Sequence, residues 1–260
     1  MRIALGIEYD GTPFSGWQAQ QEGVETIQGY VEQALSQVAD HPVRVFCAGR
    51  TDTGVHATGQ VIHFDSPAIR DMRSWVYGAN ANLPKGVAIT WAKPVDEAFH
   101  ARFSATRRRY RYVIFCRPVR PTFMAYRVSW SYRELDLDRM VQAAGYLVGE
   151  HDFSSYRALG CQAKSPVRTL YQLGVTGQGA FIFLDLEANG FLHHMVRNIA
   201  GVLMTIGSGE QAPAWAEEVL HYRDRTLGGV TAPPHGLYLV GVTYPDHYQI
   251  PSNSFTALPW

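Results

Sequence analysis

Apolar and polar residues alternate over residues 2–9 in the manner of a β-strand. Ile27, Val31, Leu35 and Val38 then recur at helical spacing. Strand patterns follow over residues 43–49 and 59–65, a second helical pattern covers 71–83, and a further strand pattern covers 87–95. The first part of the chain therefore predicts the element order β-α-β-β-α-β.

The second part of the chain repeats this order without repeating the sequence. Residues 107–116 read as a strand, and a helix beginning near Leu137 can be capped by Asp136. A hairpin turning near Gln178 and Gly179, helices over 191–206 and 214–223, and a last strand over 236–244 follow. We predict an α+β fold in which two ferredoxin-like halves, residues 1–104 and 105–260, form a largely antiparallel sheet with helices on one side.

The distribution of charge is more informative than its total. The formal net charge is zero, yet only three of the 23 basic residues are lysines and the others are arginines. Residues 98–133 contain no Asp or Glu, and their many arginines are interleaved with aromatic residues. Arginine suits phosphates and stacks on bases, so this stretch predicts a surface for single-stranded or looped RNA. A basic strand facing solvent is the alternative interpretation.

Other classes of protein are disfavoured by the composition. Cys47, Cys116 and Cys161 are odd in number and far apart, which fits neither a disulfide framework nor a Cys-x-x-Cys metal site. Glu8 and Asp10 come too early for a signal peptide, and no apolar run approaches the length of a membrane span. We expect a soluble cytoplasmic protein without a membrane segment.

Arg197 lies in a predicted helix that is apolar nearly all round, so we expect this arginine to be buried. The stripe from Leu192 to Ile206 places Arg197 where an unpaired charge would be expensive. Asp52 is one candidate partner, and Asp185 and Glu187 are the purely structural candidates. His193 and His194 are not expected to form a metal site, because adjacent residues point about 100° apart on a helix.

The segment AGRTDTGVHA, residues 48–57, contains a single carboxylate, Asp52, that is a candidate catalytic group. Taken alone, Arg-Thr-Asp-Thr-Gly is typical of an ordinary polar turn. Two features favour a function: the segment lies between two apolar strands, and Arg50 brings a cation two residues from Asp52.

Five motifs occur in a fixed order from one end of the chain to the other. They are YDGTPFSGWQAQ from Tyr9, AGRTDTGVHA from Ala48, RRYRY from Arg108, FLHHMVRN from Phe191 and APPHGLYL from Ala232. Together they resemble the tRNA pseudouridine synthase A family over almost the whole chain, and no departure is seen at the key positions. The ordered set is specific, whereas any single motif would be weak.

The resemblance implies an activity and a set of roles. The family isomerises uridine to pseudouridine at positions 38, 39 and 40 of the tRNA anticodon arm. By resemblance, Asp52 is the nucleophile, Tyr110 packs on the target base, and Arg197 pairs with the catalytic carboxylate. Arg50 is expected to help position the RNA, and Leu237 to line the base pocket. The family acts as homodimers, and the resemblance implies a central RNA-binding cleft.

The chemistry needs no cofactor and no metal, because the isomerisation involves neither a redox change nor transfer to a second molecule. One carboxylate suffices to attack either the sugar C1′ or the base C6, and both routes stay open. Either Tyr110 or a water can take the C5 proton. An opposite charge such as Arg197 favours the ionised carboxylate in a dry pocket.

Further RNA contacts are expected from the arginine run and from the loop after the first strand. Arg107, Arg108 and Arg109 are candidates for phosphate contacts, with Arg108 on the face of Tyr110 and Arg109 and Arg111 pointing away from it.

In the loop, Trp17 and Gln18 are candidates for contact with RNA. An ordinary surface loop is the alternative for this region.

Two other functions compete with the isomerase. A non-catalytic RNA-binding protein explains the basic stretch but leaves Asp52 without a purpose. An aspartate-dependent N-glycosidase would release free uracil and would need a group that activates water. A metal-dependent nuclease is disfavoured, because no cluster of carboxylates accompanies Asp52 in the sequence.

Overall fold

The computed structural model describes residues 1–21 and 23–251. The chain divides into two compact units. Unit 1 comprises Met1–Arg108 together with the chain from Tyr238 onward, and unit 2 comprises Arg109–Leu237. The first boundary lies close to the one expected after residue 104. The last strand, however, returns to unit 1, whereas its position in the sequence suggested the second half.

Unit 1 has the predicted element order. Its elements are β1 (Arg2–Tyr9), α1 (Ile27–Ala39), β2 (Phe46–Cys47), β3 (His56–Asp65), α2 (Met72–Asn80) and β4 (Val87–Val95), joined by β10 (Leu237–Thr243) and by a short 3-10 turn, Asp246–Tyr248. The strands lie in the order β4-β1-β3-β10, with β2 paired to β3. β1 is antiparallel to both β3 and β4, and β10 runs parallel to β3. The strand expected over residues 43–49 contracts to two residues, which leaves a longer loop before β3.

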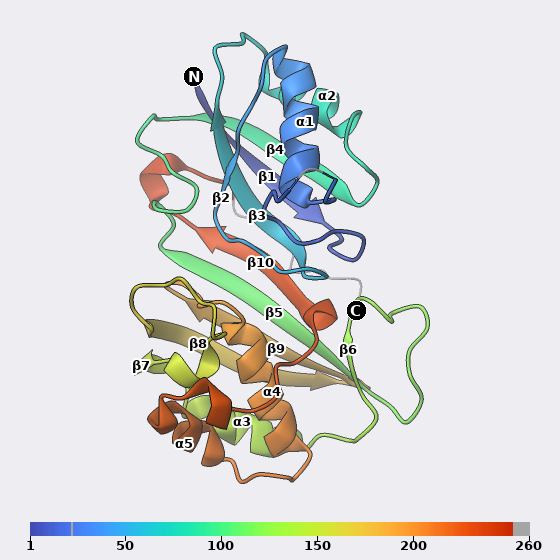
Figure 1. Ribbon diagram of the computed structural model, residues 1–260, viewed down its shortest axis with the longest axis vertical. Coiled ribbons are helices and arrows are strands. Elements are labelled where there is room, and N and C mark those ends of the chain that lie inside the picture. Colours follow the sequence, from blue (N-terminus) through green and yellow to red (C-terminus); the bar gives the residue numbers. More distant parts are fainter. Residues whose placement is uncertain (22, 252–260) are drawn as a thin grey trace. The chain divides into compact units, whose positions relative to one another are not determined.

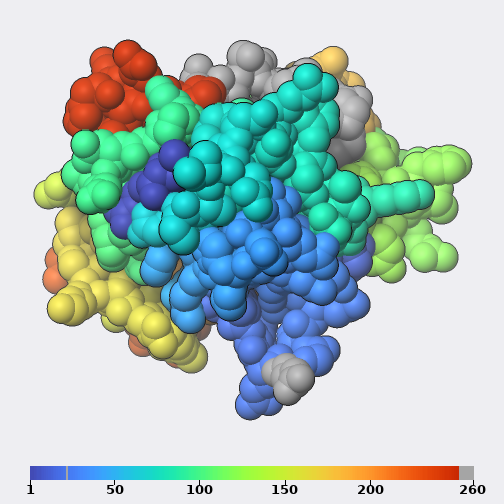
Figure 2. All heavy atoms as spheres, turned by 90° about the horizontal axis from the view of Figure 1, so that it is seen from above, coloured from blue at the N-terminus to red at the C-terminus, as the bar shows by residue number. Residues whose placement is uncertain are grey.

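Helices α1 and α2 pack side by side in unit 1, and Figure 2 shows their blue and teal atoms next to each other. The hydroxyl of Thr26 caps α1 by accepting the Gly29 N–H at 3.3 Å, and Val31 and Leu35 are buried beneath it. The helical stripe expected from the sequence is thus the core-facing side of α1.

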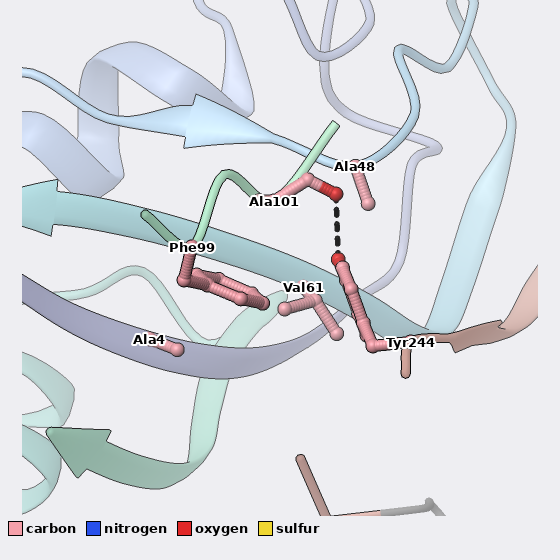
Figure 3. Packing of buried hydrophobic residues seen from close by; sticks show 6 residues of the cluster. All are labelled: Ala4, Ala48, Val61, Phe99, Ala101 and Tyr244. Carbon is pink, nitrogen blue, oxygen red and sulfur yellow. Dashed lines mark hydrogen bonds between the residues drawn. The ribbon is translucent and has the colours of Figure 1, made fainter. Parts of the chain in front are cut away.

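An apolar cluster in unit 1 holds the start of the loop that leads to Asp52. Ala4 of β1 and Val61 of β3 pack there with Ala48, Phe99, Ala101 and Tyr244 (Figure 3). The Tyr244 hydroxyl donates to the Ala101 carbonyl at 2.7 Å, so the buried phenol is satisfied.

Unit 2 contains β5 (Arg107–Cys116) from Arg109 onward, β6 (Ser129–Ser131), α3 (Leu137–Gly145), β7 (Gly149–Asp152), β8 (Val167–Gln178), β9 (Phe181–Ala188), α4 (Met195–Gly207) and α5 (Trp215–Tyr222). Three short 3-10 turns cover Ser154–Tyr156, Arg225–Leu227 and Pro234–Gly236. The strands follow the order β5-β9-β8-β7, and β6 runs parallel to β5 (Figure 1). Helices α3, α4 and α5 contact one another, and α3 packs on β8.

Most of the element predictions for unit 2 are confirmed. Asp136 caps α3 by accepting the Arg139 N–H at 3.0 Å, and the β8–β9 hairpin turns at Gly179 with a φ of 58°. The helix expected over residues 191–206 was placed too early at its N-terminus. His194 has a φ of 62°, a left-handed conformation, so α4 begins only at Met195.

The predicted fold class is confirmed: the chain is a mixed α+β protein whose strand pairs are mostly antiparallel. Within the described residues, no helix has both the length and the apolar character needed to cross a membrane.

We predict that protonation of His63 destabilises the protein as the pH falls. The side chain is 1% exposed on β3, and its Nδ1 accepts the Ala101 N–H at 3.1 Å. Burial lowers the pKa of His63 from 6.5 to about 4, helped by the charges of His100 and Arg2 and opposed by Asp65. The unfolded chain therefore binds the proton first, and stability should be lost between pH 6.5 and 4, by up to roughly 3 kcal/mol.

Chemical unfolding of the wild type and of His63→Gln across this pH range measures the effect. A glutamine oxygen can still accept the Ala101 N–H, so the variant serves as a non-titrating control. Its free energy of unfolding should fall less steeply with acid. Equal slopes for the two proteins would contradict the assignment.

Candidate functional site

The loop between β2 and β3 is fixed to unit 1 by side chains of the neighbouring strands. Gln60 of β3 accepts the Gly49 N–H at 3.3 Å and donates to the Gly49 carbonyl at 2.6 Å. The hydroxyl of Thr51 lies 2.8 Å from the hydroxyl of Tyr9 on β1. Two points of the loop, one before and one after Arg50, are thus anchored to the sheet.

The segment after β1 packs directly against the same loop. The Trp17 N–H donates to the Thr51 carbonyl at 3.0 Å, and Gly16 adopts a φ of 86°. A Cβ on Gly16 would stand 2.9 Å from the Thr51 carbonyl oxygen, so both the conformation and the close approach require glycine. The motif from Tyr9 and the motif from Ala48 form one structural element in unit 1.

Trp17 itself has a structural position. Its side chain is 1% exposed, and its ring lies 5.9 Å from the ring of Tyr9. The structure therefore does not support the predicted contact of Trp17 with RNA, because an RNA base cannot reach a ring that the core of unit 1 covers. Gln18 donates to the side-chain oxygen of Gln28 at 2.8 Å, and its RNA contact stays a prediction.

Asp52 lies on the turn that this anchoring produces. It is half-buried between Thr51, which is buried, and Thr53, which is exposed. The Asp52 carbonyl accepts the Val55 N–H at 3.1 Å, and Gly54 closes the turn with a φ of 76°. Backbone bonds on both sides of the carboxylate limit its movement, which is what a positioned nucleophile requires. Arg50, two residues earlier, is exposed.

The start of β3 is held in the same way. The imidazole of His56 is buried, stacks on Tyr238 of β10 at 4.7 Å, and accepts the Gly11 N–H through Nδ1 at 3.1 Å. A Cβ on Gly11 would stand 2.0 Å from the Val55 carbonyl oxygen. His56 thus fixes the exit of the loop, and its burial suits a structural role.

Cys47 is excluded as a competing nucleophile in this region. Burial raises the pKa of its thiol to about 12, although the positive charges of Arg50, Arg102 and Arg108 act in the opposite direction. The thiol therefore stays protonated at neutral pH, and a thiol is a far weaker nucleophile than a thiolate.

The arginine run at the start of β5 divides between structural and surface positions. Arg108 donates to the carbonyl oxygens of Ala48, Arg102 and Ala105, which ties the segment before β5 to the loop of unit 1. A phosphate would have to compete with these bonds, so the contact predicted for Arg108 has no support from them. Arg107 is exposed, and its phosphate contact stays a prediction, as does that of Arg109.

Tyr110 occupies β5 within unit 2. Its side chain is 8% exposed, and its ring meets the ring of Phe191 edge-on, with the centroids 5.0 Å apart and the planes at 81°. Phe191 is the first residue of the FLHHMVRN motif, which contains the start of α4. Two of the sequence motifs therefore meet through an aromatic contact in this unit.

Arg197 lies in the first turn of α4 and is half-buried rather than buried. Its Nε–H donates to the Ala232 carbonyl at 2.9 Å, while the Ala232 N–H donates to the Arg197 carbonyl at 3.1 Å. The first bond holds the guanidinium, and the second joins the backbone of α4 to the motif from Ala232. Asp185, one of the candidate partners, is bound by Arg111 through two bonds of 2.7 and 2.8 Å.

The segment from Val230 to Leu237 lies very close to both α4 and β5. A Cβ on Gly201 of α4 would stand 1.7 Å from the Val230 carbonyl oxygen, and a Cβ on Gly236 would stand 2.5 Å from that of Val113. Leu237 is buried at the start of β10. The close approach at Gly236 fixes the backbone directly before Leu237, and the contact of Leu237 with a base stays a prediction.

His235 is a candidate that the sequence analysis did not single out, although it stands within the APPHGLYL motif. Burial, followed by the charge of Arg197, lowers the pKa of the imidazole, so the ring is neutral at neutral pH. Its Nδ1 is buried without a hydrogen-bond partner among the described residues. A neutral imidazole can donate one hydrogen bond and accept another, so the half-buried ring of His235 is a candidate for binding a polar ligand.

Comparison with known proteins gives one consistent answer. Residues 6–104 and 143–245 match the family model described as tRNA pseudouridine synthase. The chain is 60% identical over 260 residues to the tRNA pseudouridine synthase A of Nitrosococcus oceani, with both chains covered in full. It is 58% identical to that of Alcanivorax borkumensis and 57% identical to that of Pseudomonas aeruginosa, each match covering 96% of this chain and 94% and 88% of the relatives.

Gly16→Ala should destabilise the Asp52 loop more than a matched substitution nearby. Gly23 has nearly the same φ, 88°, but no atom lies within 4 Å of the Cβ that alanine would add there. Both variants suffer backbone strain, whereas only Gly16→Ala also meets the backbone of Thr51 and Asp52. We expect a free energy of unfolding about 1–3 kcal/mol lower for Gly16→Ala than for Gly23→Ala. Denaturant titration measures it, and equal losses would refute the close packing.

Proposed function

The chain belongs to the tRNA pseudouridine synthase A family, and on that premise we propose that it isomerises uridines 38, 39 and 40 in the anticodon stem-loop of tRNA, with Asp52 as the nucleophile. The family and its isomerase activity rest on the match over most of the chain. The observation that carries the assignment of Asp52 is its turn, which buried side chains and backbone bonds anchor on both sides.

The proposed reaction is a rearrangement within one nucleotide. The bond from C1′ to N1 breaks, the uracil turns, and a bond from C1′ to C5 forms. C5 loses a proton and N1 gains one, so no oxidant, reductant or second substrate is needed. Attack of the Asp52 carboxylate at C1′ would give an ester to the sugar and release the uracil into the site, which must hold it by contacts while it turns. Attack at C6 would instead bind the uracil covalently to Asp52.

Arg197 is proposed to supply the positive charge that the reaction requires. An ionised carboxylate in a site from which water is excluded is stabilised by an opposite charge. The Nε–H bond to Ala232 holds the guanidinium in one orientation, which favours a fixed electrostatic role over a mobile surface charge. Arg50, exposed beside Asp52, is proposed to help position the RNA.

Tyr110 is proposed to pack on the target uracil. A uridine must leave its stack to react, at a cost of a few kcal/mol, and an aromatic ring can offset this by stacking. The edge-on contact with Phe191 orients the Tyr110 ring. Either the Tyr110 hydroxyl or a water takes the C5 proton in this scheme.

RNA affinity is proposed to come from arginine contacts with phosphates, with Arg107, Arg109 and Gln18 as candidates. Such contacts tolerate many sequences and weaken with salt. We further propose that the enzyme acts as a homodimer in the cytoplasm, as the resemblance to its family suggests.

Product analysis tests the proposal directly. Wild-type protein is incubated with tRNA transcripts carrying uridine at positions 38–40, and the RNA is digested to nucleosides for chromatography. We expect pseudouridine, no free uracil, and modification at positions 38–40 when pseudouridines are mapped by carbodiimide-dependent primer extension. Arg197→Met, in the same assay, should lose most of the product while Tyr77→Ala on α2 does not.

Two results would overturn the proposal. Free uracil without pseudouridine would establish the N-glycosidase instead. Binding of several tRNAs without any change in them would establish a non-catalytic RNA-binding protein.

A further inference from the structure

The loop between β5 and β6, residues 117–127, forms an arm that extends from unit 2 (Figure 1). Its fold is ordered by local bonds. The Arg117 guanidinium donates to the carbonyl oxygens of Val119 and Arg120 at 2.5 and 2.7 Å, and the Trp130 indole donates to the Arg117 carbonyl at 2.8 Å. Turns at Thr122 and Met124 close the far end. The arm therefore presents its side chains from a defined backbone.

The arm exposes apolar side chains that the core does not use. Phe123 is 98% exposed, Val119 is 69% exposed and Tyr126 is 59% exposed. Single exposed apolar residues are normal, but three within one short ordered loop are a concentration that favours binding.

The positive charge of the arm indicates what kind of partner it binds. The arm carries Arg117, Arg120 and Arg127 and has no Asp or Glu, and the acid-free stretch continues to Arg133. Arg120 and Arg127 are exposed and stand three and four residues from Phe123 in the sequence. An exposed aromatic ring with arginines close to it in the sequence suits a nucleic acid strand, because bases can stack on the ring and phosphates can bind the guanidinium groups.

The base of the arm contacts the candidate site of the same unit. The ring of Tyr126 meets the ring of His235 edge-on, with the centroids 5.3 Å apart and the planes at 80°. His235 stands three residues after Ala232, whose carbonyl holds Arg197, and its pKa is influenced by the charge of Arg197. RNA that reaches Arg197 would therefore come close to the base of the arm.

We propose that the arm is an RNA-binding element in which Phe123 stacks on an unpaired base of the substrate and Arg120 contacts an adjacent phosphate. The inference rests on the proposed function, because it takes tRNA as the occupant. It adds residues outside the five motifs, and it assigns them to affinity for the RNA rather than to the chemical step.

The test measures binding of an unmodified tRNA transcript to the full chain carrying Asp52→Asn, so that the RNA is not converted during the titration. In this background, Phe123→Ala should raise the Kd roughly five- to hundredfold, the range expected for loss of one base–aromatic stack. Phe123→Tyr, which keeps a stacking ring, should restore binding. Tyr77→Ala, at an aromatic residue 65% exposed on α2, is the matched control and should change the Kd less than twofold.

The salt dependence of tRNA binding distinguishes the role of Arg120 from that of Phe123. Arg120→Ala should weaken binding and reduce the slope of log K against log salt by about one, because one phosphate contact is lost. Phe123→Ala should leave that slope unchanged, since stacking releases no counterion. Arg73→Ala on α2 is the control for loss of an exposed arginine and should leave the Kd within twofold.

The arm and the proposed function can fail separately. If wild-type protein forms pseudouridine but Phe123→Ala binds tRNA as tightly as the parent, the arm assignment is wrong and the enzyme assignment stands. If Phe123→Ala changes the oligomeric state in sedimentation, the arm contacts a second copy of the chain instead. If wild-type protein forms no pseudouridine, the proposed function has failed whatever the arm does.

Discussion

The rest of the structure depends on how tightly the backbone before Asp52 is packed. Thr51 is held at its side chain by Tyr9 and at its carbonyl by Trp17, and Gly16 fits against that carbonyl only because it has no Cβ. A loop of polar residues would otherwise sample many conformations, each with a different position of the carboxylate. Because an orientation error of about 1 Å can cost a catalyst two orders of magnitude, this packing is the physical basis for giving Asp52 a chemical role.

Unit 2 follows a similar principle with different elements. The segment from Val230 to Leu237 lies so close to α4 and β5 that Gly201 and Gly236 must lack a side chain. The same closeness lets the Ala232 backbone accept a bond from the Arg197 side chain and donate one to the Arg197 carbonyl. The motifs that begin at Phe191 and Ala232 show no obvious relation in the sequence. In the structure they pack together and orient the guanidinium of Arg197.

Local patterns in the sequence predicted the elements well. Alternation and helical spacing located the strands and helices of unit 1, and Asp136 marked the start of α3 as a capping residue should. They failed where long-range packing decides the outcome. Nothing near His194 signals its left-handed backbone, and the pairing of β10 with β3 joins residues far apart in the chain. Trp17 looked like a surface residue because the loop around it is polar, yet it is part of the core. His235 was missed because one histidine among prolines and glycine has no periodic signal.

The claim that Asp52 performs the chemistry is tested most directly with tRNA labelled with tritium at C5 of uracil. Isomerisation through C5 must release the label to water, and Asp52→Asn keeps the size of the side chain while removing its charge. The account predicts release by the wild type and none by Asp52→Asn, with both proteins folded and binding the tRNA. Equal release by the two proteins would contradict it and would reduce Asp52 to a turn residue.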